Sequence, residues 1–389
     1  MKQRIFIFTG KGGVGKTSVA AAHAVKSAGE GHKTILVSTD MAHNLADLFE
    51  MRLGREPEKV SDDLDIYEID PEYVMEHDFS AMIESLNKLL PISGNMGAEE
   101  YGMLPGMEEL FALLKIKEIY QSEEYERIIV DCAPTGETLS LLKFPELLSW
   151  YMEKLFPIGK VAVRVLSPVA KQLYKVELPN REAMNEIEKM YLKLNELQEL
   201  LKNRETTSVR LVTLPEKMVV EETKRNYMYM NLFDYNVDGL YINRILPEHL
   251  DNPFFEQWIQ IQEKYRQELA ESFQALPIYE IPWYDEEVRG IRAVQRICDD
   301  ALNKEDIMEA KEISQREVFE QNQDGYLLRL AIPFAEKSEV GLSQTEVELI
   351  IKLGNFKRNI PLPDVLRTYT VGSAKMEDGV LNVQFRKGE

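Results

Sequence analysis

Short apolar runs alternate with longer amphipathic stretches along most of the chain. Each apolar run is nearly continuous and is bounded by turn or helix residues, which is typical of parallel strands covered on both faces. The stretches between them repeat apolar residues at helical spacing. The predicted strands are 4–9, 34–38, 127–130, 209–214, 239–245 and 278–281, and the predicted helices include 14–28, 215–233 and 254–273. The pattern therefore predicts an α/β fold with a mostly parallel sheet covered by helices.

Two segments depart from this alternation. Residues 141–203 contain no strong strand signal, and apolar residues recur there at helical spacing, so we expect a helical insertion. Its apolar stripe could pack on the domain or form a client-binding groove, and the pattern leaves both open. After residue 322, short β-type runs appear at 326–332, 346–353 and 380–385. We therefore predict one domain over 1–315 and a small β-sandwich-like domain over 322–389.

A glycine-rich turn joins the first predicted strand to the first predicted helix. Its sequence, GKGGVGKT, satisfies the pattern G-x-x-x-x-G-K-[ST] of a P-loop NTPase in the expected strand-to-helix setting. The glycines let backbone N–H groups turn toward phosphate oxygens, and the helix N-terminus favours the same negative charge. Lys16 can neutralise the β- and γ-phosphates, and Thr17 can ligate Mg²⁺. The predicted nucleotide-binding residues here are Gly10, Lys11, Gly12, Gly13, Val14, Gly15, Lys16, Thr17 and Ser18.

Two Asp residues follow predicted strands and complete this candidate site. Asp131 closes the strand 127–130, where a Walker B carboxylate reaches Mg²⁺, commonly through water. Asp40 follows the strand 34–38, at the edge where open α/β sheets bind their ligands. A single Asp at a strand end is more often a helix cap, but two of them in a P-loop domain favour metal binding. We therefore expect Thr17, Asp131 and Asp40 to form the site for Mg²⁺ beside ATP.

The charge of the chain restricts its partners. The sequence has 46 Lys and Arg against 66 Asp and Glu, a formal net charge of −20, and no local basic stripe stands out. Such a chain repels polyphosphate backbones, so we do not expect nucleic acid as a partner. The segment from residue 321 onward is balanced in charge, so the acidic excess lies before it.

The cysteines and the N-terminus indicate the compartment. Only Cys132 and Cys298 occur, and they have no metal-ligand spacing. This excludes a secreted disulfide framework and indicates a reducing compartment. The apolar run at the N-terminus is too short for a signal peptide, and no run of about 18 apolar residues could span a membrane. We therefore expect a cytoplasmic protein with no integral membrane segment.

Lys11, a second lysine inside the P-loop, makes the motif resemble the deviant Walker A of dimeric ATPases. Within that group, further segments resemble the arsenite-pump and tail-anchored-protein targeting ATPases in the order that this family uses. These segments are the first switch STDMAHNL at 38–45, LPGMEE at 104–109, the second switch DCAPTGETL at 131–139, TLPE at 213–216, INR at 242–244 and EVRG at 287–290. The resemblance covers about residues 1–310. It implies an anion-transporting type of ATPase that works as a homodimer.

The resemblance also implies roles for individual residues. Asp40 would orient or activate the attacking water, and Lys11 would reach the partner's nucleotide and compensate charge, as an arginine finger does. Asn243 would hydrogen-bond adenine, and Pro282 would line the same pocket. Glu216 is a further candidate in the nucleotide site.

The sequence also departs from the family in ways that bear on its substrate. Met41 and Asn44 replace the usual Pro and Ser of the first switch, which concerns its stiffness more than its chemistry. The arsenite branch binds its metalloid through several thiolates, and the targeting branch clamps its dimer with zinc through a CxxC in each subunit. With Cys132 and Cys298 alone, neither thiolate triad nor zinc clamp is available. The same shortage argues against a cluster-carrying iron protein.

The end of the chain resembles a second family. IPLP at 360–363 followed by AKMEDGVLNVQF at 374–385 is similar to the end of a small heat-shock (α-crystallin) domain. The Asp-Gly pair at 378–379 agrees, because it predicts a tight turn between two strands. The segment is shorter than a full α-crystallin sandwich, so a β appendage without a client role stays open.

These observations lead to three hypotheses. The first is a cytoplasmic, Mg²⁺-dependent ATPase whose homodimer couples ATP binding and hydrolysis to binding and release of an apolar client, such as a membrane-protein segment. The second is the energising ATPase subunit of an anion or metalloid exporter, with a membrane transporter subunit as its partner. The third is a scaffold or chaperone in which nucleotide binding only toggles dimerisation.

Overall fold

The computed structural model of the chain forms two compact units, one comprising Met1–Thr207 and Tyr284–Glu309, the other Ser208–Trp283 and Ala310–Glu389. The structure describes residues 3–40, 44–81, 83–84, 107–132, 181–248, 250, 252–303, 307–309, 311 and 317–387. The predicted domain limits, 1–315 and 322–389, follow sequence motifs rather than these units and stay a prediction.

The first unit is built on five strands. They are β1 (Arg4–Thr9), β2 (Thr34–Ser38), β3 (Glu58–Ser61), β4 (Leu64–Glu68) and β5 (Arg127–Asp131), in the spatial order β3-β4-β2-β5-β1. All neighbouring pairs are parallel except β3 with β4. The side chains of β1, β2 and β4 are buried throughout, which explains their near-continuous apolar sequences.

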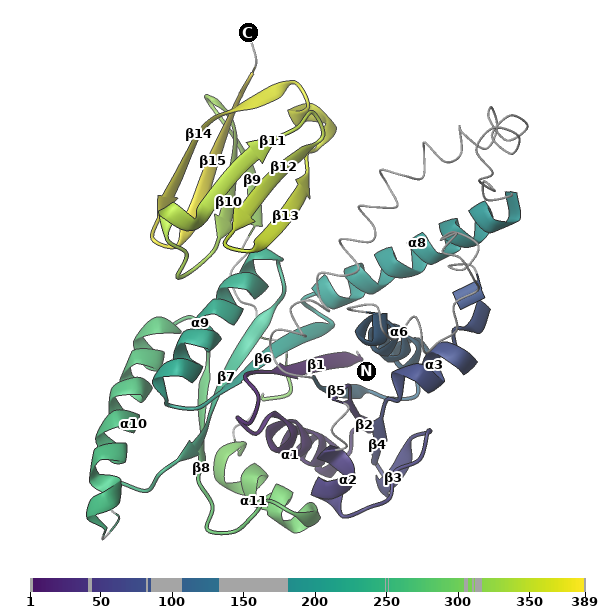
Figure 1. The fold of residues 1–389 in the computed structure, drawn as a ribbon, viewed down its shortest axis with the longest axis vertical. Coiled ribbons are helices and arrows are strands. Elements are labelled where there is room, and N and C mark those ends of the chain that lie inside the picture. Colours follow the sequence, from purple (N-terminus) through teal and green to yellow (C-terminus); the bar gives the residue numbers. More distant parts are fainter. Residues whose placement is uncertain are drawn as a thin grey trace, which may run out of the picture. The chain divides into compact units, whose positions relative to one another are not determined.

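Helices of the first unit form two groups, drawn on opposite sides of the strands in Figure 1. Contacts join α1 (Lys16–Gly29), α2 (Asn44–Phe49) and α11 (Gly290–Ala301) into one group. A second group contains α3 (Pro71–His77), α6 (Met107–Gln121) and α8 (Arg181–Lys202). α8 lies within the predicted helical insertion and is helical as expected, whereas the rest of that insertion, 141–180, lies outside the described residues.

The second unit begins with the parallel strands β6 (Thr207–Thr213), β7 (Val237–Ile245) and β8 (Ile278–Pro282). α9 (Lys217–Leu232) joins β6 to β7, and α10 (Pro253–Ser272) joins β7 to β8. At the start of α10, the side chain of Asn252 accepts a hydrogen bond from the N–H of Phe254 at 3.0 Å, and Pro253 follows. This is the N-cap arrangement that starts a helix.

Two antiparallel sheets complete the second unit. One has the order β14-β15-β10-β9 and the other β11-β12-β13. Their strands are β9 (Glu317–Asn322), β10 (Gly325–Ala331), β11 (Val340–Gln344), β12 (Glu348–Leu353), β13 (Phe356–Pro361), β14 (Tyr369–Glu377) and β15 (Val380–Lys387). Short 3₁₀ turns lie at Lys337–Glu339 and Asp364–Leu366. The predicted fold class, a mostly parallel sheet with helices plus a small antiparallel β domain, is confirmed.

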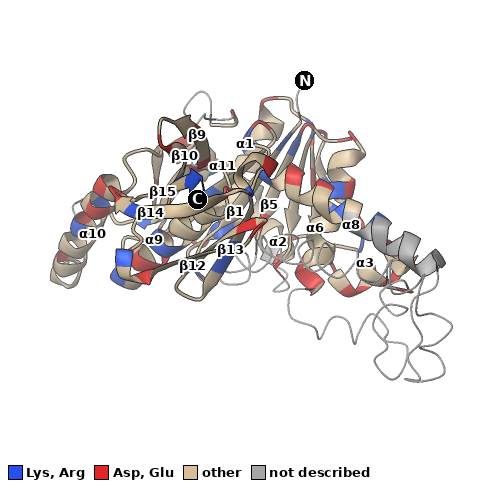
Figure 2. Cartoon of the chain, turned by 90° about the horizontal axis from the view of Figure 1, so that it is seen from above, with Lys and Arg blue, Asp and Glu red and all other residues tan. Residues whose placement is uncertain are grey.

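Arg358 of β13 joins the β domain to α9 within this unit. Its guanidinium donates to the carbonyl of Leu232, the last residue of α9, at 2.6 Å and to the carboxylate of Glu317. A helix C-terminus leaves carbonyls without intrahelical partners, and a buried cation there is also favoured by the helix dipole. Acidic side chains lie on surface helices of both units, among them α3, α6 and α10 (Figure 2).

Candidate functional site

The P-loop has the backbone that its glycines predict. β1 ends at Thr9, α1 begins at Lys16, and the turn between them carries Gly13 and Gly15 at φ of 82° and 88°. Only glycine adopts this left-handed region without steric cost. Gly15 is the N-cap of α1 and offers no side-chain hydrogen bond to the helix. The first N–H groups of the fourteen-residue α1 are therefore left for an anion.

A buried hydroxyl–carboxylate pair lies at the start of α1. The hydroxyl of Thr17 donates to Oδ2 of Asp131 at 2.7 Å, and Asp131 is completely buried at the end of β5. Burial raises the pKa of Asp131 to about 7, with the nearby Asp40 adding to the rise, while Thr17 and the charge of Lys16 act in the opposite direction. The structure therefore brings together four of the predicted residues: Lys16, Thr17, Asp40 and Asp131.

This pair fits Mg²⁺. Oδ1 of Asp131 is buried and has no hydrogen-bond partner among the residues that the structure describes. Hard divalent cations prefer such hydroxyl and carboxylate oxygens, and a bound cation would offset the cost of burying the charged carboxylate. Without a cation beside it, the charged form of the buried Asp131 carboxylate is unfavourable, which agrees with the raised pKa of this group.

The switch residues are described in part. Asp40 is half-buried at the end of β2, and its backbone N–H bonds to the hydroxyl of Ser38 at 3.1 Å. Lys11 lies half-buried in the P-loop, and Lys16 is 6% exposed. The remainder of the first switch, 41–43, and of the second switch, 133–139, lies outside the described residues.

The other predicted nucleotide residues belong to the second unit. Asn243 is buried near the end of β7, and its side-chain oxygen accepts the N–H of Arg244 at 2.9 Å. Pro282 ends the neighbouring strand β8, and Glu216 is the N-cap of α9. These residues thus share the carboxyl ends of β6, β7 and β8, where α/β sheets bind ligands.

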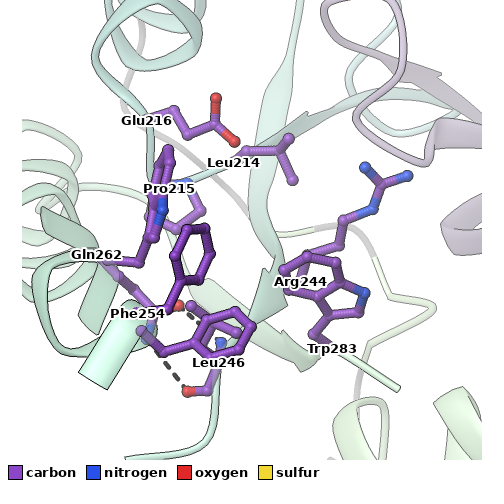
Figure 3. A pocket seen from close by; sticks show the side chains of 10 residues that line it. Leu214, Pro215, Glu216, Arg244, Leu246, Phe254, Gln262 and Trp283 are labelled. Carbon is purple, nitrogen blue, oxygen red and sulfur yellow. Dashed lines mark hydrogen bonds between the residues drawn. The ribbon is translucent and has the colours of Figure 1, made fainter. Parts of the chain in front are cut away.

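Beside them is an apolar pocket of about 310 Å³ that the sequence patterns did not reveal (Figure 3). It is lined by Leu214, Pro215, Glu216, Arg244, Leu246, Phe254, Phe255, Trp258, Gln262 and Trp283. Neither Asn243 nor Pro282 lines it. Its signal in the sequence is the group of three aromatic residues within NPFFEQW at 252–258, at a helix start where polar residues are usual.

Both thiols are buried. Cys132 follows β5, and Cys298 of α11 directs its sulfur toward the carbonyl of Ala22 on α1 at 3.0 Å. Burial raises the pKa of each thiol to about 12. The thiolate, which is the form that binds soft metalloids and reacts with electrophiles, is therefore scarce at neutral pH.

We expect Cys132 and Cys298 to resist alkylation in the folded protein. A pKa of about 12 in place of about 9 lowers the thiolate fraction about a thousandfold at pH 8, and burial also blocks access. Mass spectrometry after N-ethylmaleimide treatment should find rates at least about 100-fold below those in guanidinium chloride. Rapid labelling of either thiol in the native protein would contradict this.

Among the residues that the structure describes, no helix is both long enough and apolar enough to cross a membrane.

Comparisons with known proteins cover nearly the whole chain. A family model described as anion-transporting ATPase matches residues 3–303, and one described as an HSP20-like domain found in ArsA matches residues 323–385. A provisionally named arsenical pump-driving ATPase of Chlorobaculum tepidum is 35% identical over 387 residues, covering 98% of this chain and 96% of the relative. A similarly named protein of Aquifex aeolicus is 34% identical over 388 residues, covering 96% of this chain and 98% of the relative. ATPase GET3C of Arabidopsis thaliana is 29% identical over 324 residues, covering 77% of this chain and 82% of the relative.

Proposed function

Because this chain belongs to the anion-transporting ATPase family and is an ATP hydrolase, we propose that it works as a homodimer that binds and releases an apolar protein segment during ATP turnover. The observation that carries the catalytic part is the buried Thr17–Asp131 pair, with Lys16 and Asp40 near the same carboxylate. The HSP20-like match over 323–385 supports client handling, because the small heat-shock domain that this segment resembles is a client-binding fold.

Each residue of the site has a task in hydrolysis. The P-loop N–H groups and Lys16 hold the phosphates and balance their charge. Asp40 orients the attacking water and accepts its proton. Thr17 and Asp131 hold Mg²⁺, which supplies electrostatic stabilisation of charge on the phosphate oxygens. Lys11 acts on the nucleotide of the partner copy, and Asn243, Pro282 and Glu216 hold the base end of the nucleotide.

Replacing Asp40 by Asn should lower kcat by about 10²-fold, because loss of a positioned base removes general-base catalysis while phosphate binding stays intact. Phosphate release measures the rate, and titration with a fluorescent ATP analogue checks binding. Asp47→Asn is the matched control, since Asp47 is exposed on the neighbouring helix α2. Equal turnover in Asp40→Asn and Asp47→Asn would remove Asp40 from the mechanism.

The slow Asp40→Asn variant also tests client binding. We expect a fluorescent peptide of about 20 apolar residues, presented in detergent, to change its affinity at least about tenfold between the nucleotide-free and MgATP-bound variant. An affinity that is the same in both states would refute coupling to an apolar client, even if turnover is confirmed.

The names of the relatives favour a second candidate, the ATPase subunit of an arsenical exporter. This candidate predicts that arsenite or antimonite stimulates turnover. The two buried thiols, with the pKa of each raised to about 12, do not favour a metalloid site on the described cysteines. Stimulation of more than about twofold that survives replacement of both cysteines by Ala would support the exporter through other ligands.

A further inference from the structure

The β domain supplies part of the C-terminal cap of α9. In the last turn of this helix, the carbonyls of Tyr229, Met230 and Asn231 receive backbone N–H groups from the residues that follow. The carbonyl of Leu232, next in the chain, receives the guanidinium of Arg358 in β13 at 2.6 Å. Arg358 is 6% exposed, and burial of a cation is costly unless it has partners of this kind. The end of α9 and the β domain are therefore fixed to each other.

Aromatic contacts join the same parts. The ring centroid of Phe356, at the start of β13, lies 3.8 Å from that of Tyr229 in α9. Phe334, between β10 and β11, packs beside Phe273 at the end of α10 with the two centroids 5.5 Å apart. The ammonium of Lys224 in α9 lies 5.8 Å from the centroid of the Phe334 ring. Pairs of aromatic rings at these distances and a cation near a ring stabilise a packed contact.

The backbone of Phe334 shows that this contact has a defined geometry. Its φ is 67°, in the left-handed region that a bulky residue rarely adopts. Strained backbone of this kind persists only where the surrounding structure imposes it. Lys224 also pairs with Glu268 of α10, so the cation beside the ring is held as well. The β domain is thus docked on α9 and α10 rather than loosely tethered to them.

The other end of α9 belongs to the candidate nucleotide site. Glu216 is the N-cap of this sixteen-residue helix, which is about 24 Å long. The hydroxyl of Thr223, in the second turn, donates to the hydroxyl of Thr213 at the end of β6 at 2.8 Å, and both residues are buried. Thr213 begins the TLPE segment that ends at Glu216. One rigid helix therefore runs from the β domain to the carboxyl end of β6.

We propose that the β domain sets the position of α9 and, through it, the affinity of the site for nucleotide. Arg358 and Phe334 are positioning residues, which act through α9 rather than by contact with the nucleotide. A packed helix moves as a rigid element, so a change at its last turn also displaces its N-cap. The inference rests on the proposed function, in which Glu216 holds the base end of the nucleotide. It gives the HSP20-like domain a task within the ATPase itself.

Calorimetric titration of the full chain with MgADP measures this affinity. We expect Arg358→Met to raise Kd at least about fivefold, and Arg358→Lys to have a smaller effect because lysine keeps the charge but lacks the planar fork that reaches both the Leu232 carbonyl and Glu317. Phe334→Ala should also raise Kd at least about threefold. Since the Phe334 ring is 38% exposed, this second variant covers the case in which Arg358→Met does not fold.

The matched control is Arg329→Met. Arg329 forms an exposed pair with Glu320 at 3.4 Å within the β domain, so this variant should bind MgADP as wild type does. Steady-state turnover then separates positioning from general loss of structure. Arg358→Met should raise KM for MgATP at least about fivefold and change kcat by less than about twofold. Partial unfolding would lower kcat with the folded fraction and leave KM unchanged.

A double-mutant cycle tests the route through α9. In a Glu216→Gln background, Arg358→Met should raise Kd for MgADP by less than about twofold more, because the helix end through which the arginine acts no longer contributes. Coupling is also reciprocal, so bound MgADP should slow amide exchange at 226–235 and 354–361 at least about threefold in wild type but not in Arg358→Met. Exchange at 369–377, in β14 of the other sheet, should be the same with and without MgADP.

The inference is overturned if Arg358→Met and Phe334→Ala bind MgADP as tightly as Arg329→Met. It is also overturned if the effects of Arg358→Met and Glu216→Gln multiply, which would mean that the two residues act independently. A wild-type chain that binds MgADP but shows neither coupling leaves the ATPase assignment standing. A wild-type chain that neither binds MgADP nor hydrolyses MgATP contradicts the proposed function and this inference together.

Discussion

Replacing Lys16 by Ala is expected to lower kcat/KM for MgATP by about 10³-fold or more. Lys16 is 6% exposed at the first turn of α1, and its charge already acts on the carboxyl of Asp131. A buried cation aimed at the phosphates stabilises charge both in the bound substrate and in the transition state, so its loss should raise KM and lower kcat together. A coupled assay of phosphate release over a range of ATP concentrations separates the two effects.

The matched control is Lys26→Ala on the same helix. Lys26 pairs with Glu30 at 2.8 Å, and an i,i+4 pair of this kind contributes only about 0.3–0.5 kcal/mol to stability. We expect this variant to turn over ATP within about twofold of wild type. If Lys16→Ala keeps wild-type kcat/KM, the P-loop is not the hydrolytic site of this chain.

The elements that the sequence predicts well are those whose side chains are buried on every face. β1 and β2 have the predicted limits, and β5, β7 and β8 agree within two residues, because the apolar character of a covered parallel strand is local information. The P-loop could be predicted for the same reason. Its glycines, Lys16 and Thr17 are contiguous in the sequence, and their spacing alone fixes the backbone.

β4 was missed because its polar residues are satisfied by distant partners. Asp65 is buried and accepts bonds from Tyr125 and Lys33, and Glu68 accepts the N–H groups of Leu45 and Ala46. In the sequence, LDIYE therefore resembles a half-exposed segment, although every residue is buried. Burial of a charged side chain depends on tertiary hydrogen bonds that no local pattern contains.

The aromatic pocket could not be predicted for a related reason. Its walls come from the ends of β6, β7 and β8 and from the start of α10, so residues as distant as Leu214 and Trp283 meet only after the strands are ordered. The β domain was predicted in part: β10, β12 and β15 carry regular apolar alternation, whereas β14 is largely exposed and has little apolar signal. Edge strands of this kind give weak patterns because one side faces water.

Replacing Arg210 by Met is expected to destabilise the second unit by about 3–5 kcal/mol. Nε of Arg210 in β6 donates to Oδ1 of Asp238 in β7 at 3.2 Å, and both residues are 2% exposed. Oδ2 of Asp238 has no hydrogen-bond partner in the part of the chain that is described. Removal of the guanidinium therefore leaves a buried carboxylate without its counter-charge, which costs more than the ion pair itself contributes.

The double variant Arg210→Met/Asp238→Leu separates the cost of a buried carboxylate without its counter-charge from the contribution of the ion pair itself. Because neither charge remains buried, we expect it to recover most of the lost stability, so the two single changes should be strongly non-additive. Urea unfolding followed by the fluorescence of Trp258 and Trp283, in a Trp150→Phe background, reports on the second unit. Arg266→Met is the control, because Arg266 pairs with Glu280 at 2.7 Å near the surface and should cost less than about 1 kcal/mol. Additive losses in the double variant would show that the cost of Arg210→Met comes from lost packing around the arginine stem rather than from an uncompensated charge.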